Sequence, residues 1–143
     1  MGTKETNLFA DRMTPSEIAR FSPVVGRIIP KIMRHWAVSD EDGASLLSVS
    51  GDQLSEMKGG HWQGLLTQAQ LERASLLINI FSDLRRLHSS NEAADQWVSR
   101  ALRDPPFEGR RPLDLMLAGS EGILSVRCWL LAALTEGAES YRR

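Results

Sequence analysis

Apolar residues recur at intervals of three to four along most of this chain, and capping residues, prolines or glycines separate the segments that show this spacing. This period predicts amphipathic helices. No segment alternates apolar and polar residues with the β-branched enrichment of a half-buried strand. The pattern therefore predicts an all-α protein.

Cap signals predict where the longer helices of the first two thirds begin. Thr14-Pro15-Ser16-Glu17 combines a capping threonine, a proline at the first helical position and a glutamate that completes a capping box. Ser22-Pro23 repeats the cap-then-proline signal. The apolar face that follows it consists of Val24, Ile28, Ile32 and Trp36. Thr67-Gln68-Ala69-Gln70 opens the longest helix, whose apolar stripe ends at about His88.

Two short helices are predicted between these long ones, from about Asp40 to Leu47 and from about Gly51 to Lys58. Ser39 is placed to cap the first helix, and Gly59-Gly60 ends the second through backbone freedom at positive φ. A pair of short helices joined by Ser48-Val49-Ser50 is typical of a helix-turn-helix unit.

The helix-turn-helix register places small and apolar residues where two helices must pack. When Asp40 is the first position, Ala44 falls at the close crossing of the two helices. The predicted buried positions are Val49, Leu54 and Met57. The residues predicted to face DNA are Ser50, Asp52, Gln53, Ser55 and Lys58. Flanking positive charge is available from Arg27, Lys31, Arg34, His35 and His61. The pattern leaves two interpretations open, a DNA-binding motif and a plain helical hairpin.

The last third of the chain predicts shorter helices with sharp boundaries. A helix from Glu92 to about Arg103 is stopped by Asp104-Pro105-Pro106, because proline cannot continue the hydrogen-bond ladder. Its predicted buried side consists of Ala94, Trp97, Val98, Ala101 and Leu102. Pro112 to Ala118 forms a short helix. Gly119 ends it, and Ser120 caps a last helix that runs to Gly137 with Ile123, Val126, Leu130 and Leu134 on its apolar face.

These elements suggest four parts along the chain. Residues 1–13 form a flexible N-terminus, residues 14–66 a helix-turn-helix domain, residues 67–90 a connecting helix and residues 91–143 a small C-terminal domain. The connecting helix carries apolar residues on more than one side, so it is expected to serve both the core and a dimer seam.

The composition of the 143-residue chain limits the classes of protein that it can belong to. Hydrophobic residues make up 42% and charged residues 24%, which is typical of a folded soluble protein. A net charge of -1 provides no global basic field, so any contact with nucleic acid needs a local patch. The chain begins without the apolar core of a secretory signal and contains no membrane-spanning run. We therefore expect a cytoplasmic protein.

Residues that could carry chemistry are scattered. His35, His61 and His88 lie far apart without acidic or cysteine companions at ligand spacing, so no metal site is expected. Cys128 has no evident base and is expected to be a core or interface thiol. No catalytic residue and no cofactor are predicted.

The order of elements near the end of the chain resembles one known family. A tryptophan-bearing helix (Ala94 to Leu102) precedes the loop Phe107-Glu108-Gly109-Arg110-Arg111 and the segment Pro112-Leu113-Asp114-Leu115-Met116. Gly119, Glu121-Gly122 and a terminal helix from Leu130 to Gly137 follow. This order is similar to the toxin-binding domain of MbcA/ParS/Xre antitoxins over roughly residues 83–137. Residues 36–73 resemble the Xre-like helix-turn-helix that precedes that domain.

The resemblance implies a type II antitoxin whose partner is a RES-domain toxin that consumes NAD. Such an antitoxin covers the toxin's active site with its C-terminal domain and performs no chemistry itself. The resemblance further implies a homodimer within a toxin–antitoxin hetero-oligomer, which binds operator DNA as a transcription repressor of its own operon. The carboxylates of Asp52 and Glu56 on the second short helix depart from the expected pattern of a strong operator binder.

Two groups of residues are predicted to contact the toxin. The first is the corner formed by Phe107, Arg110 and Arg111, and the second is the tail residues Tyr141, Arg142 and Arg143. Arginine and tyrosine are frequent anchors of protein interfaces. A frayed, solvated terminus is the alternative interpretation of the tail.

A stand-alone helix-turn-helix transcriptional regulator is the alternative function. In that case the C-terminal domain serves dimerisation or ligand sensing. Salt-sensitive operator binding without any toxin would favour this alternative.

Overall fold

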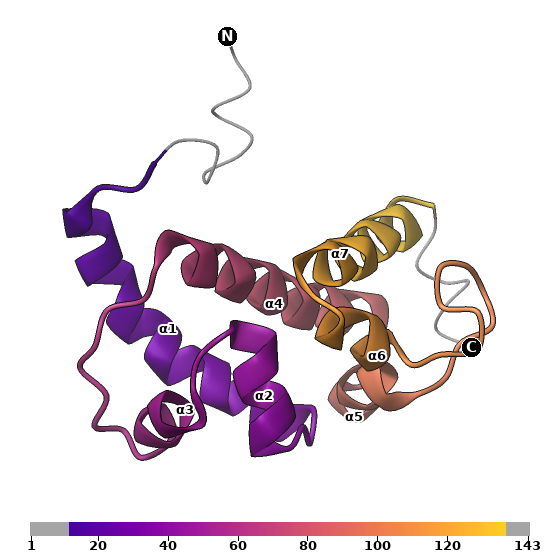
Figure 1. The fold of residues 1–143 in the computed structure, drawn as a ribbon. Coiled ribbons are helices and arrows are strands. Elements are labelled where there is room, and N and C mark those ends of the chain that lie inside the picture. The colour runs from indigo at the N-terminus through magenta and orange to yellow at the C-terminus, as the bar shows by residue number, and fades with distance from the viewer. Residues whose placement is uncertain (1–11, 137–143) are drawn as a thin grey trace, which may run out of the picture.

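The computed structural model describes residues 12–136, and these form an all-α fold without strands, as the sequence predicts (Figure 1). The helices are α1 (Pro15–His35), α2 (Asp40–Leu47), α3 (Gly51–Lys58), α4 (Gln68–Leu87), α5 (Asn91–Gln96), α6 (Pro112–Leu117) and α7 (Ser120–Thr135). Helix α4 lies centrally and packs against α1 on one side and α7 on the other. Among residues 12–136, none of the helices combines the length and apolar character that crossing a bilayer requires.

Helix α1 is one continuous helix, whereas the sequence predicted a second start at Ser22-Pro23. Thr14 and Glu17 form the predicted capping box. Ser22 does not cap a new helix, because its hydroxyl forms two other hydrogen bonds within the fold. Its Oγ donates to the carbonyl oxygen of Ile18 at 2.6 Å and accepts from the N–H of Leu66 at 2.9 Å. Tertiary packing of α1 therefore overrides the local proline signal.

The buried face of α1 differs from the predicted one. Val24 is 37% exposed, although the sequence placed it on the apolar face. Ile32 and Trp36, the latter at the C-cap of α1, are buried as predicted, and the other residues of α1 that enter the core are Val25, Ile29 and Met33. The physical reason is that a step of four residues turns about 40° beyond one full turn of the helix. Residues at repeated intervals of four therefore drift around the helix and do not stay on one face.

The predicted apolar stripe of α4 lies at the centre of the core. Of its predicted members, Leu77, Ile80, Leu84 and Leu87 are buried and Phe81 is half-buried; Leu71 and Ala74 extend the buried side toward the start of the helix. Because α1 and α7 cover this stripe within one chain, its residues serve the intramolecular core.

The C-terminal helix boundaries differ from the sequence prediction in two places. Helix α5 ends at Gln96 and continues only as a 3₁₀ turn, Trp97–Ser99, so Ala101 is exposed and not part of a helix. Gly119, not Ser120, stands at the N-cap of α7. Its φ of 138° is costly for other residues, which explains why glycine occupies the turn between α6 and α7.

One buried charge lies between α4 and α7. Asp83 is 3% exposed, and its Oδ2 atom lies 3.0 Å from Nε of Arg127. Neither atom has a well-aligned hydrogen-bond partner, so this contact is an ion pair without hydrogen-bond geometry. Burial outweighs the attraction of Arg127 and Arg86 and raises the pKa of Asp83 above its ordinary value of 3.8.

We expect the variant Asp83→Asn to gain stability relative to wild type as the pH rises. A raised pKa means that the folded protein holds this proton more tightly than the unfolded chain does. The contribution of Asp83 to stability is therefore present below its unfolded pKa and is lost as the pH rises through the folded pKa. Asparagine does not titrate. Urea unfolding at several pH values between about 3 and 7 should show the variant-minus-wild-type difference rising with pH, and a constant difference would contradict the assignment.

Candidate functional site

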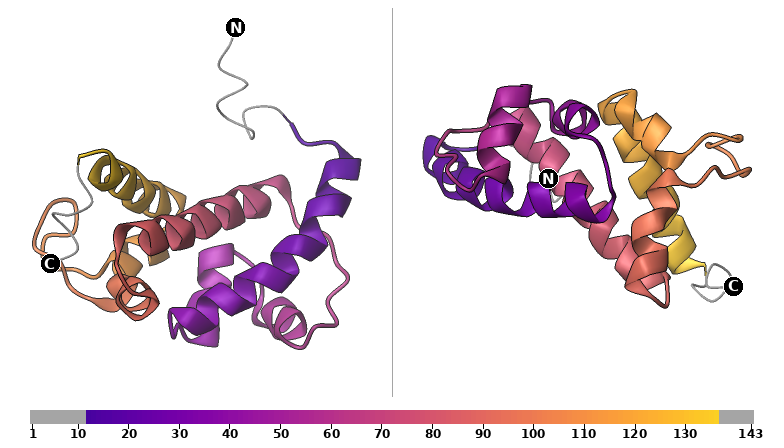
Figure 2. Two further views of the ribbon diagram at one scale, coloured as in Figure 1. Left: turned by 180° about the vertical axis from the view of Figure 1, so that it is seen from behind. Right: turned by 90° about the horizontal axis from the view of Figure 1, so that it is seen from below.

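The segment from Leu102 to Arg110 forms a closed loop, the 102–110 loop, which projects from the body of the molecule (orange in Figure 2). The N–H of Leu102 donates to the carbonyl oxygen of Arg110 at 3.1 Å, and the N–H of Gly109 donates to the carbonyl oxygen of Leu102 at 2.7 Å. Glu108 and Gly109 have φ values of 51° and 90°. Because Leu102 pairs with the far side of the loop, the predicted helix cannot continue to Arg103.

Three aromatic rings, the aromatic cluster of Trp97, Phe107 and Trp129, hold this loop from inside. The ring centroid of Phe107 lies 5.8 Å from that of Trp97 and 5.4 Å from that of Trp129. The Phe107 side chain is 0% exposed. The prediction that Phe107 contacts a toxin directly therefore needs correction: in this chain the ring is inside, where it anchors the loop.

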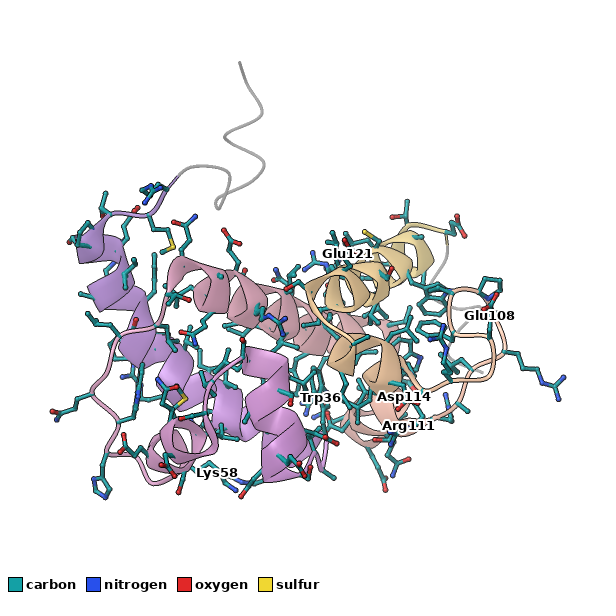
Figure 3. The ribbon with its side chains drawn as sticks, viewed as in Figure 1. Trp36, Lys58, Glu108, Arg111, Asp114 and Glu121 are labelled. Carbon is teal, nitrogen blue, oxygen red and sulfur yellow. The ribbon has the colours of Figure 1, made fainter. Side chains whose placement is uncertain are left out.

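The two arginines of the predicted corner differ in their surroundings. Arg110 is exposed, and its guanidinium donates to the carbonyl oxygens of Phe107 and Pro106 at 3.2 and 3.1 Å. Arg111 is half-buried and forms an ion pair with Asp114, with Nη2 2.6 Å from Oδ1 (Figure 3). The hydrogen bond from Arg111 lowers the pKa of Asp114. Arg111 therefore lies at the predicted corner with its charge already paired.

Other predicted site residues fall outside this corner. Tyr141, Arg142 and Arg143 lie outside the described residues. Cys128 is exposed on α7, which leaves an interface role open and corrects the core alternative. Within residues 12–136, no group of three or more His, Cys, Asp or Glu side chains is arranged to hold a metal ion.

Helices α2 and α3 form the predicted hairpin, here called the α2–α3 hairpin. Ser48 turns the chain between them with a φ of 65° in the left-handed region. Ala44, Leu54 and Met57 are buried at the crossing, as the helix-turn-helix register requires, and Val49 is half-buried. The packing of the hairpin was thus predictable from residue size and apolar character alone.

Most of the side chains predicted to face DNA take part in the structure of the hairpin. Ser50 and Gln53 form a reciprocal capping box, in which each side chain accepts from the other's backbone N–H at 3.1 Å. Lys58 pairs with Asp40 across the hairpin. Asp52 and Ser55 are exposed. The hairpin also carries Glu41, Asp42 and Glu56, so acidic residues predominate on it.

Replacing the cap residue should destabilise α3 without touching the core. Ser50→Ala removes the acceptor for the N–H of Gln53, and we expect the free energy of unfolding to fall by about 1 kcal/mol. Ser55→Ala is the matched control, because Ser55 is exposed within α3 and does not cap it. Urea unfolding followed by circular dichroism measures both variants. Equal stability of the two variants would contradict the capping role.

A polar junction that the sequence analysis missed joins three helices. Asp95 on α5 accepts from the guanidinium of Arg85 on α4 at 2.9 and 3.0 Å, and its Oδ2 lies 3.1 Å from Nδ1 of His35 on α1. The Arg85 guanidinium also lies 4.5 Å from the ring centroid of Phe81. No local pattern marks this junction, because His35, Arg85 and Asp95 are separated from one another by 10 to 60 residues.

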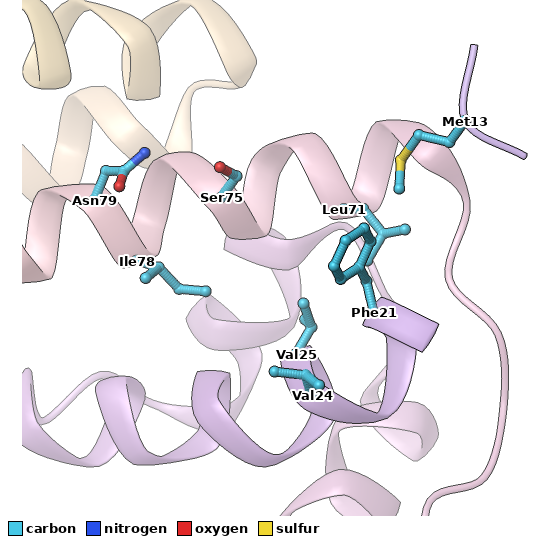
Figure 4. A pocket seen from close by; sticks show the side chains of 8 residues that line it. All are labelled: Met13, Phe21, Val24, Val25, Leu71, Ser75, Ile78 and Asn79. Atoms are coloured by element: carbon cyan, nitrogen blue, oxygen red, sulfur yellow. The ribbon is translucent and has the colours of Figure 1, made fainter. Parts of the chain in front are cut away.

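An apolar groove of about 210 Å³ lies between the first half of α1 and α4 (Figure 4). Phe21 and Val24 line one side, Ile78 lines the other, and Met13 closes one end. Ile78 belongs to the second apolar side of the long helix that the sequence predicted. The groove explains why Val24 is partly exposed.

Together the fold and these sites define an all-α protein with a helical hairpin at one end and a ring-anchored loop at the other. The chain is 30% identical over 105 residues to the "Uncharacterized protein y4oB" of Sinorhizobium fredii (strain NBRC 101917 / NGR234), and the match covers 73% of each protein. The chain belongs to the same family as that protein. No family model matches the chain. No solved structure matches it either.

Proposed function

We propose that this protein is a type II antitoxin that neutralises a RES-domain, NAD-consuming toxin by placing residues 91–143 over the toxin's active site. The proposal includes a homodimer within the toxin–antitoxin complex and repression of its own operon through operator DNA. The protein acts by binding, and the proposal assigns it no cofactor and no reaction.

The 102–110 loop is the observation that carries the proposal. Its backbone is closed by the Leu102 hydrogen bonds, and Phe107 is fully buried beneath it. A loop that is already ordered loses little conformational entropy on binding, which favours affinity. Glu108 (Figure 3) and Arg110 remain exposed on it for contact with polar groups at the rim of a cleft.

Helix α7 adds apolar surface to the same part of the chain. Leu124 and Leu131 are 49% and 42% exposed, and Cys128 between them is exposed as well. These three positions are spaced by four and three residues, so they share one side of the helix. Exposed apolar side chains that adjoin one another are a common feature of protein interfaces, which supports contact with a second polypeptide.

Coexpression with the product of the adjacent open reading frame tests the proposal. We expect that product to copurify with this protein, and we expect growth inhibition by the product alone to be relieved. Failure of both copurification and growth rescue would overturn the antitoxin assignment.

A charge reversal localises the contact. Arg110→Glu should weaken toxin binding at least tenfold, about 1.4 kcal/mol, because Arg110 is exposed on the 102–110 loop. Arg100→Glu is the matched control: this arginine is exposed just before the loop and brings the same change of charge. Titration calorimetry measures both, and thermal melts confirm that both variants fold. Equal affinities of the two variants would place the contact elsewhere.

A stand-alone transcriptional regulator is the second candidate function, and the packing of the α2–α3 hairpin favours it. Burial of Ala44, Leu54 and Met57 fits the register of a DNA-binding helix-turn-helix. This candidate predicts sequence-specific binding to the upstream DNA and no effect on the neighbouring gene product. The coexpression experiment therefore separates the two candidates.

A further inference from the structure

Helix α1 carries a row of cations on the side that faces away from the core. The row consists of Arg20, Arg27, Lys31 and Arg34, all of which are exposed. At about 100° per residue the four side chains fall within an arc of about 60°. The fully buried Ile29 lies opposite this arc. The side chains of the row therefore point away from the core, and α1 itself lies along an outer edge of the molecule (Figures 1 and 2).

The charges of the row are not neutralised within the described chain. From Arg20 to Arg34 the sequence of α1 contains no acidic residue. Within residues 12–136, none of the four cations forms an ion pair, and only Arg20 has an aromatic contact, with Phe21 at 4.8 Å. Four unpaired cations on one rigid helix make a local positive field in a protein whose net charge is -1.

The neighbouring elements preserve this field. Arg34 borders a groove together with Lys58 and Asp40, and the carboxylate of Asp40 is already paired with Lys58. Arg27 borders a small pocket beside Trp62, and His61 next to it is exposed.

We propose that the α1 row, and not the outer face of the α2–α3 hairpin, binds the phosphate backbone of duplex DNA. This inference rests on the repression part of the proposed function, which makes DNA the polyanion concerned. Duplex DNA carries one negative charge per about 1.7 Å of its axis. The row spans about 21 Å along the helix, from residue 20 to residue 34 at about 1.5 Å per residue, so its cations can face several phosphates at once.

The acidic residues of the α2–α3 hairpin also favour α1 as the helix that contacts DNA. A hairpin that docked with its outer face would bring Asp52 and Glu56 toward phosphates. A membrane surface suits α1 less well than DNA does, because the apolar side of α1 is buried in the core. Phosphate contacts position a protein on DNA and do not select sequence. The row therefore supplies affinity and orientation, and sequence selection comes from other side chains.

The experiment compares two double variants of the full chain that lose the same charge. Arg27→Gln/Lys31→Gln removes the middle of the row. Arg100→Gln/Arg103→Gln removes two exposed cations from the C-terminal part. Fluorescence anisotropy measures binding to the duplex upstream of the protein's own gene, to an unrelated duplex and to duplex RNA over a range of salt concentrations. Flotation with phosphatidylserine vesicles tests a membrane, and coexpression rescue is measured for the same variants.

We expect Arg27→Gln/Lys31→Gln to lose affinity for both DNA duplexes at least tenfold. The slope of the logarithm of the binding constant against the logarithm of the salt concentration should become shallower by about 1.8, because two phosphate contacts disappear. The control pair should bind DNA like wild type, and Arg27→Gln/Lys31→Gln should still rescue growth. Undiminished DNA binding by the α1 variant would overturn the inference and leave the antitoxin proposal standing. Preference of wild type for RNA or vesicles, or no binding to any duplex, would overturn the inference too. Loss of growth rescue by wild type would instead overturn the proposed function.

Discussion

Gly122→Ala is expected to lower the free energy of unfolding by about 3 kcal/mol, the upper part of the range for overpacked sites. A methyl group at this position would lie 1.8 Å from the carbonyl oxygen of Leu115 and 2.7 Å from its carbonyl carbon. Both are backbone atoms of α6, so no side chain can rotate to make room. Helices α6 and α7 would have to separate, although they are among the most closely packed pairs in the fold. Urea unfolding measures the loss.

Gly51→Ala is the matched control for this substitution. Gly51 also lies near the start of a helix, but nothing would approach a methyl group there within 4 Å. We expect unchanged or slightly higher stability, by up to about 1 kcal/mol, because alanine restricts the unfolded chain. Comparable losses of unfolding free energy in both variants would show that the close contact of α6 and α7 does not cause the destabilisation.

Phe107→Ala is expected to cost about 3–5 kcal/mol and to release the 102–110 loop. The substitution removes a fully buried ring from between Trp97 and Trp129. Tryptophan emission should shift to longer wavelength, because water reaches both indoles. If the loop carries the toxin contact, affinity for the toxin should fall as well, even in conditions where the variant stays folded. Chemical unfolding and titration calorimetry measure the two effects.

Glu108→Ala serves as the control for the Phe107 substitution. Its side chain is exposed on the same loop, so stability should stay within about 0.5 kcal/mol of wild type. A Phe107→Ala protein with wild-type stability and wild-type toxin affinity would contradict the anchoring role of the aromatic cluster.

Local signals in the sequence predicted the helices well. Thr14, Ser39 and Thr67 each accept from a backbone N–H three residues onward, as their predicted capping roles indicated. Ser50 caps α3 in the same way, although the sequence analysis placed it only in the set that faces DNA. Such caps act within one turn of helix, so neighbouring residues are enough to predict them. The all-α class follows from the same local information.

The errors arose where distant residues decide the outcome. Ser22-Pro23 looked like a helix start, but Leu66, 44 residues away, uses the Ser22 hydroxyl. Phe107 was predicted to contact the toxin as part of the corner that it forms with Arg110 and Arg111. Its burial depends on Trp97 and Trp129, whose spacing in three dimensions no local period reveals.

The pairing of charged side chains could be predicted only in part. The pairing of Arg111 with Asp114 follows from their three-residue spacing at the start of α6 and could have been recognised in the sequence. The pairing of Lys58 with Asp40 could not, because it depends on how α2 and α3 cross. The α1 row lies between these cases. Its spacing is helical, but its isolation from carboxylates is visible only in the fold.

The NAD content of cells that express the neighbouring gene is the most direct test of the antitoxin proposal. Cells that express that gene alone should lose most of their NAD, and cells that also express this protein should keep it. Arg100→Glu should protect NAD as wild type does, whereas Arg110→Glu should protect it less. An equal loss of NAD with and without this protein, when both proteins are present in soluble form, would contradict the proposal.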